Sequence, residues 1–147
     1  MPELAVVEVS GSIPYAVVTV FELLSDYSRV NSVIDGLEAL SPLDQNCGVG
    51  ARFTARFRIA GRSHTLELRL EEARRAELVT WTGLGGSDRS VAFHLAAAGE
   101  KTSLRIVTRY PPAAGLAGFL ARPVVASTVR EHAERTLGLL REGGWRL

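Results

Sequence analysis

The sequence predicts an α+β fold in which a curved antiparallel sheet of about six or seven strands wraps around one long C-terminal α-helix, with two short helices after the first strand. Apolar and polar residues alternate for about seventy residues beyond Leu37, which is typical of strands with one buried face. Apolar residues then recur every three or four positions from about Pro112, which indicates a helix with one buried stripe. This helix would cover the apolar face of the sheet.

The N-terminal residues predict a strand followed by two short helices. Residues 4–10 are rich in β-branched side chains, and the Gly-Ser-Ile-Pro stretch that follows ends the strand. Pro14 suits the first helical position, because a proline has no N–H to leave unpaired there. Over 15–25 one apolar stripe recurs at helical spacing, at Val17, Val20, Phe21 and Leu24. Asp26 is then suited to cap a second helix, which Gly36 ends.

The middle of the chain predicts a series of antiparallel strands. Residues 49–59 and 65–71 alternate most clearly, and a glycine-containing turn between them predicts a hairpin. Arginines lie on the polar face of the first strand and glutamates on that of the second, so we expect Arg–Glu pairs across the hairpin. Three more strands are expected over 77–82, 89–96 and 102–110.

The C-terminal segment predicts a helix from about Pro112 to Glu142, where two glycines end it. Pro123 lies inside this pattern, so we expect a kink or break near Leu120 between a short piece and a long one. The apolar stripe of the helix comprises Leu116, Phe119, Ala126, Val129, Ala133, Leu137 and Leu140.

Composition narrows the class of protein. With 147 residues, 46% of them hydrophobic, the chain is expected to form one ligand-binding domain over 1–147. The formal net charge of +1 gives no field that would attract nucleic acid, and no apolar window predicts stable membrane insertion. Cys47 is the only cysteine, which excludes an internal disulfide and a multi-thiolate metal site. We expect a cytoplasmic protein, either a monomer or a homodimer.

Four short motifs follow one another in the order of the helix-grip fold. They are Ile13-Pro14, Leu24-Ser-Asp-Tyr27, Gly48-Val-Gly-Ala-Arg-Phe53 and Gly99-Glu-Lys-Thr-Ser-Leu104. On these marks nearly the whole chain resembles the SRPBCC superfamily, which includes START-like lipid carriers, plant pathogenesis-related allergens and bacterial polyketide cyclase/dehydrase-like proteins. The second helix departs from the pattern, because 29–34 lacks the tryptophan and proline that members often carry. The resemblance implies a fold and a hydrophobic ligand, and no particular reaction.

A cavity between the sheet and the long helix is expected on two grounds. The facing residues are small, as with Ala51 and Ala55 on the strand and Ala126 and Ala133 on the helix. Members of the superfamily also commonly have such a cavity, whereas the alternative is close packing of small against large side chains. The residues expected to contact a ligand are Phe53, Phe57, His64, Leu66, Leu68, Trp81, Phe93, Ile106, Tyr110, Phe119, Ala126 and Val129.

Three of these candidates have polar groups that could contact a ligand: His64, Trp81 and Tyr110. His64 would meet a ligand or act as a general base, unless it is a strand-end residue bonded to the backbone. Trp81 and Tyr110 would orient a ligand or merely pack in the core. His94 and His132 are isolated in sequence and fall on polar faces, so no metal site and no cofactor are expected.

The sequence favours a protein that binds a lipid, a quinone or a polyketide-like molecule without converting it chemically. The first alternative is a polyketide cyclase/dehydrase-type enzyme that uses the same cavity, with its catalytic residues unknown. The second is a protein-interaction module with a closed cavity. No pair of carboxylates falls on the inner face, which disfavours two-acid hydrolysis.

Overall fold

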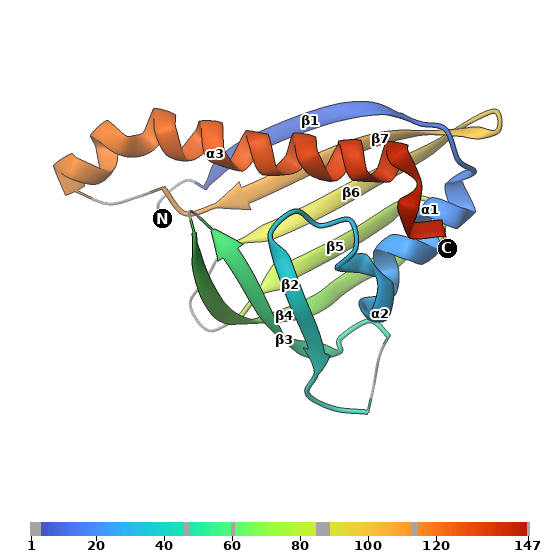
Figure 1. The fold of residues 1–147 in the computed structure, drawn as a ribbon, viewed down its shortest axis with the longest axis horizontal. Coiled ribbons are helices and arrows are strands. Elements are labelled where there is room, and N and C mark those ends of the chain that lie inside the picture. The colour runs from blue at the N-terminus through green and yellow to red at the C-terminus, as the bar shows by residue number, and fades with distance from the viewer. Residues whose placement is uncertain (1–3, 46–47, 60, 85–88, 113–114, 147) are drawn as a thin grey trace.

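The computed structural model describes residues 4–45, 48–59, 61–84, 89–112 and 115–146. Within these residues, seven strands form one antiparallel sheet in the order β1-β7-β6-β5-β4-β3-β2. The elements along the chain are β1 (Ala5–Ile13), α1 (Val17–Ser25), α2 (Tyr27–Val30), β2 (Leu37–Pro42), β3 (Arg52–Ile59), β4 (Arg62–Arg74), β5 (Leu78–Gly83), β6 (Ser90–Ala98), β7 (Lys101–Tyr110), α3 (Gly115–Glu142) and η1 (Gly144–Arg146). The predicted α+β arrangement is confirmed, with α3 lying along the sheet (Figure 1).

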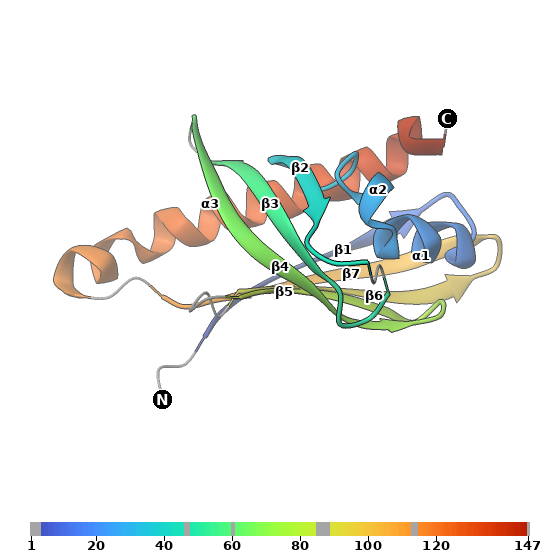
Figure 2. The same cartoon turned by 90° about the horizontal axis from the view of Figure 1, so that it is seen from below.

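The sheet curls so that its two ends lie on different sides of the molecule. β1 and β7 pack against α3, whereas the β2, β3 and β4 end turns upward beside the helix (Figure 2). The register shifts between Leu70 and Glu72 in β4, and again between Leu37 and Ala39 in β2. Irregularities of this kind bend a strand and increase its twist, so they help the sheet to curve around a space under α3.

The two short helices close one end of the sheet. α1 begins at Val17 rather than at Pro14, because Ala16 is still extended and serves as its N-cap. Asp26 caps α2 as predicted, by accepting a hydrogen bond from the backbone N–H of Ser28. α2 is shorter than expected, and turns connect it to Gly36.

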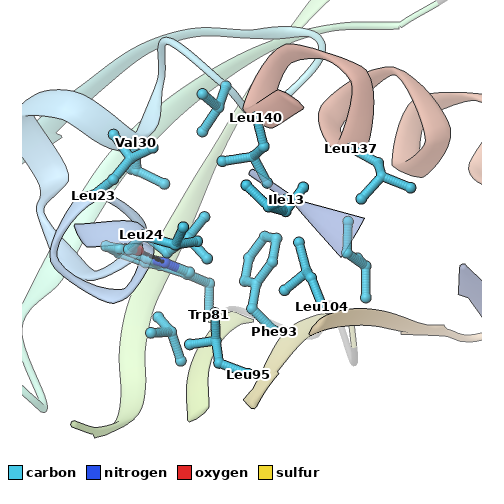
Figure 3. Close-up of a cluster of buried hydrophobic side chains, with 14 of the residues drawn as sticks. Ile13, Leu23, Leu24, Val30, Trp81, Phe93, Leu95, Leu104, Leu137 and Leu140 are labelled. Atoms are coloured by element: carbon cyan, nitrogen blue, oxygen red, sulfur yellow. Dashed lines mark hydrogen bonds between the residues drawn. The ribbon is translucent and has the colours of Figure 1, made fainter. Parts of the chain in front are cut away.

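The core lies where α1, the C-terminal part of α3 and the centre of the sheet meet (Figure 3). Leu24, Phe93 and Leu140 have no exposed surface there. Each fully buried side chain of this size stabilises the fold by about 1.5–3 kcal/mol. Trp81 is also buried, and its Nε1 donates a hydrogen bond of 3.0 Å to the carbonyl oxygen of Leu24, which ties the sheet to α1.

The long helix differs from its prediction in two ways. α3 is one continuous helix through Pro123, so it has no break near Leu120, and of the predicted kink or break only the break is excluded. The helix extends past the sheet at this end (Figure 1), and water can reach the carbonyl that Pro123 leaves without a donor. Leu116 is 76% exposed, so the apolar stripe does not cover the sheet at its beginning. No described helix combines the length and the apolar character needed to cross a bilayer.

The outer face of the β3–β4 hairpin lacks the cross-strand Arg–Glu pairs expected there. Arg52 lies opposite Arg69, and Arg56 lies opposite Thr65. Arg69 instead forms a 2.6 Å ion pair with Glu71 on its own strand. Alternation predicts which face of the sheet a side chain lies on. The residue opposite it on the next strand depends on the register of the hairpin, which the turn sets.

On the outer face of the central strands, His94 lies beside a small apolar cluster formed by Leu78, Ala92 and Val107. Burial lowers the pKa of His94 below its ordinary value of 6.5, and the nearby positive charges of Arg105 and Arg109 lower it further. The folded state therefore resists protonation of this imidazole.

We expect the free energy of unfolding of the wild type to fall more steeply between pH 7.5 and pH 5 than that of His94→Gln. Below about pH 6.5 the unfolded chain takes up a proton at His94 that the folded chain binds less readily, whereas at pH 8 both states are neutral. Urea unfolding at several pH values measures the difference. Parallel pH profiles for the two proteins would contradict the account.

Candidate ligand cavity

A cavity of about 210 Å³ lies between the concave face of the sheet, the middle of α3 and the turn that joins α2 to β2. Its apolar wall comprises Val30, Ile34, Leu37, Leu40, Phe57, Leu66, Leu68, Trp81, Val91, Phe93, Ile106, Val129 and Ala133. The remaining wall residues are Gly83, Asp35, Arg89, Ser90, Thr108, His132 and Thr136. Cavities for drug-sized ligands are roughly 300–1,000 Å³, so this space suits a ligand of one or two rings, or part of a longer one.

Many of the residues expected to contact a ligand line this cavity. Those that line the cavity are Phe57, Leu66, Leu68, Trp81, Phe93, Ile106 and Val129. They come from β3, β4, β5, β6, β7 and α3, so the cavity draws on both layers of the fold. Ala51 and Ala55, whose small size suggested the gap, are fully buried and do not line it.

Phe53 and His64 lie outside the cavity. Phe53 is fully buried in the core, where it stacks on Tyr27 at 5.2 Å between ring centroids and meets Trp81 edge-on at 5.5 Å. His64 shares the inward phase, because it lies opposite Phe57, but its side chain is exposed. Phe57 lines the cavity at the same rung of the hairpin, so the phase of the strand does not by itself decide which side chain faces the cavity.

Tyr110 and Ala126 line a separate hollow, and the side chain of Phe119 lies outside the described residues. That hollow, about 310 Å³, lies between the start of β1, the end of β7 and α3. Leu4 and Val6 on its wall are exposed. The expectation that Tyr110 and Ala126 share one cavity with Trp81 is therefore wrong for this structure.

The sequence assigned His132 to a polar face of the helix, whereas the structure places it on the cavity wall. Nδ1 of His132 on α3 lies 2.5 Å from Oδ2 of Asp35 in the α2–β2 turn. The backbone N–H of Asp35 donates to Oγ1 of Thr136 at 3.0 Å, and Nη1 of Arg135 lies 3.4 Å from the same carboxylate oxygen. Three residues of α3 thus fix Asp35. His132 borders the apolar stripe one position before Ala133, which is the only sequence signal for its position.

Gly36 shapes the turn that presents Asp35. Its φ is +85°, and a Cβ there would lie 2.9 Å from the carbonyl oxygen of Arg58. The backbone N–H of Arg58 donates a 2.7 Å hydrogen bond to the carbonyl oxygen of Gly36, so the turn cannot easily move away. A glycine is therefore required both by the left-handed conformation and by the close approach of β3.

We expect Gly36→Ala to lower the free energy of unfolding by about 2–3 kcal/mol, since it adds a backbone clash to the cost of a positive φ. Gly50→Ala is the matched control. Gly50 has a φ of +90° but nothing within 4 Å of its would-be Cβ, so that variant should lose only about 1 kcal/mol. Denaturant unfolding compares them. Equal losses would show that the contact with Arg58 is unimportant.

Comparison with solved structures identifies the fold. The structure of TTHA0849 from Thermus thermophilus superposes with a TM-score of 0.79 at 19% identity, covering 94% of this chain and 95% of that one. A START superfamily protein from Mycobacterium smegmatis gives 0.77 at 14% identity, covering 93% and 94%. The Zhui aromatase/cyclase from Streptomyces sp. R1128 gives 0.74 at 19% identity, covering 97% and 94%. These similarities confirm the helix-grip fold.

Sequence comparison assigns the family. No curated protein matches the chain. The family model described as polyketide cyclase/dehydrase and lipid transport matches residues 5–142, which is almost the whole chain from β1 to the end of α3. The chain therefore belongs to the polyketide cyclase/dehydrase and lipid transport family.

Proposed function

We propose that residues 1–147 form a single cytoplasmic domain that binds a hydrophobic small molecule, such as a lipid, a quinone or a polyketide-like compound, in the cavity under α3. The observation that carries the proposal is the wall of this cavity, where apolar side chains from six strands and two helices converge on a space that no side chain fills. Removing apolar ligand surface from water would supply affinity at about 25 cal/mol per Å².

The polar groups of the cavity are fewer than its apolar side chains and come from two places on its wall. Asp35, His132 and Thr136 belong to the α3 side, whereas Ser90 and Thr108 belong to β6 and β7. A wall of this kind binds most of a ligand by its apolar surface and fixes its orientation by one or two hydrogen bonds. The proposed ligand is therefore an apolar molecule with a small polar part.

A polyketide cyclase/dehydrase-type enzyme is the second candidate function. The close pairing of His132 with Asp35 on the cavity wall supports it, because a carboxylate-oriented imidazole is a common general base. The structurally similar protein described as an aromatase/cyclase also supports this function. Incubation of the protein with a polyketide-like chain, followed by mass spectrometry, would distinguish this function from binding alone, because only an enzyme converts the chain to a product.

Titration with 2-methoxynaphthalene, an apolar bicyclic probe, tests the binding function. We expect saturable binding with one site per chain, and displacement of the probe by at least one member of a panel of fatty acids, quinones and aromatic polyketide-like phenols. Absence of saturable binding of the probe and of every panel member would contradict the proposal and favour an interaction module with no ligand.

A further inference from the structure

From the geometry of the Asp35–His132 pair we infer that the ligand carries a hydroxyl group of phenol or enol type, and that Nε2 of His132 accepts its hydrogen bond. This inference rests on the proposed binding function and names the ligand class for the same cavity. It requires that Nε2 be an acceptor, that it have no partner within the protein, and that it be reachable from the cavity.

The contact with Asp35 fixes the role of each imidazole nitrogen. An ionised carboxylate only accepts hydrogen bonds, so the nitrogen that meets it must carry the proton. That nitrogen is Nδ1, 2.5 Å from Oδ2 of Asp35. In the neutral imidazole the other nitrogen then holds a lone pair and accepts. In that neutral form Nε2 is the acceptor, and a ligand hydroxyl is the group that complements it.

His132 lies on the cavity wall, and no described protein group forms a hydrogen bond with its Nε2. Across the described residues, the Asp35 contact is the only hydrogen bond or ion pair of the His132 side chain, and no third His, Cys, Asp or Glu joins the pair to form a metal-holding group. Side-chain exposures of 29% for His132 and 24% for Asp35 leave both accessible yet mostly desolvated. A hydrogen bond made in such a place competes little with water.

The pair is also held rigidly enough to select a ligand. Asp35 is bound by Thr136 through its backbone N–H and by Arg135 through its carboxylate, while Arg135 reaches Glu131 at 3.9 Å. The charged groups facing the imidazole are thus Asp35 and Arg135, with Glu131 behind them. Arg89 lines the cavity from the segment before β6. A fixed acceptor beside an apolar wall discriminates a hydroxyl from an ether of the same size.

The test compares 2-naphthol with 2-methoxynaphthalene, two probes that share the apolar bicycle and differ in the hydroxyl donor. At pH 8 we expect the wild type to bind 2-naphthol roughly 3- to 10-fold more tightly. His132→Leu should abolish this preference, so that the two probes bind with similar affinities, and Asp35→Asn should weaken it. His64→Leu, which removes an exposed imidazole outside the cavity, is the matched control and should keep the preference.

The outcomes separate the two proposals. Equal affinities of the wild type for the two probes, or an unchanged preference in His132→Leu, would overturn the hydroxyl inference and leave the binding function standing. Failure of both probes to bind the wild type would overturn the hydroxyl inference, and failure of every member of the panel as well would overturn both proposals. If His132→Leu does not fold, imidazole ¹⁵N spectra of the wild type decide: 2-naphthol should shift the Nε2 signal of His132, and 2-methoxynaphthalene should leave it unchanged.

Discussion

Replacing Phe53 by alanine is expected to destabilise the protein by about 3–5 kcal/mol, the cost of removing a fully buried phenylalanine from a packed core. The ring has no exposed surface and contacts both Tyr27 and Trp81, so its loss leaves a hole between α2 and the sheet. A loss of this size is a large part of the stability of an ordinary domain. Denaturant unfolding followed by far-ultraviolet circular dichroism measures it.

Phe57→Ala is the matched control on the same strand. Phe57 is half-buried and borders the cavity, so its truncation mainly widens an existing space and should cost about 1 kcal/mol. It should, however, weaken binding of 2-methoxynaphthalene. Similar stability losses in the two variants would contradict the assignment of Phe53 to the core and Phe57 to the cavity wall.

Filling the cavity from α3 should have the largest effect on binding. Val129 is half-buried and lines the cavity, and an indole in its place would occupy much of the roughly 210 Å³ available. We expect Val129→Trp to lower the affinity for 2-methoxynaphthalene by roughly tenfold or more, with a change in unfolding free energy under about 2 kcal/mol. Fluorescence titration and thermal unfolding measure the two quantities.

Ala126→Trp provides the control for that variant. Ala126 lies one helical turn earlier on α3 and lines the hollow beside β1 instead of the cavity. The added indole should therefore leave the affinity for the probe within about twofold of the wild type. Loss of binding in Ala126→Trp, with binding retained in Val129→Trp, would place the ligand in the hollow and refute the site described here.

Local patterns were enough to predict the architecture and much of the cavity wall. Alternation in β3 and β4 gave the inward phase of Phe57, Leu66 and Leu68, because the side chains of a strand must point alternately to its two faces. Alternation cannot show which side chains of a face are covered. His64 and Phe57 lie opposite each other on the same face, yet Phe57 lines the cavity and His64 is exposed.

The polar part of the site could not be predicted in the same way. Asp35 and His132 are brought together only by packing of the α2–β2 turn against α3, and each alone looks like an ordinary surface residue. Helical periodicity likewise predicts that Leu116 and Val129 both lie on the apolar face of the C-terminal helix. They differ because the helix is longer than the sheet it covers, which is a property of the tertiary structure.

Native mass spectrometry of the wild type, Val129→Trp and Ala126→Trp, followed by organic extraction of each purified protein, tests the central claim most directly. The account predicts that a hydrophobic compound leaves with the wild type and with Ala126→Trp, and is absent from a folded Val129→Trp. A compound retained equally by Val129→Trp, or one lost only from Ala126→Trp, would contradict the claim that the cavity under α3 is the ligand site.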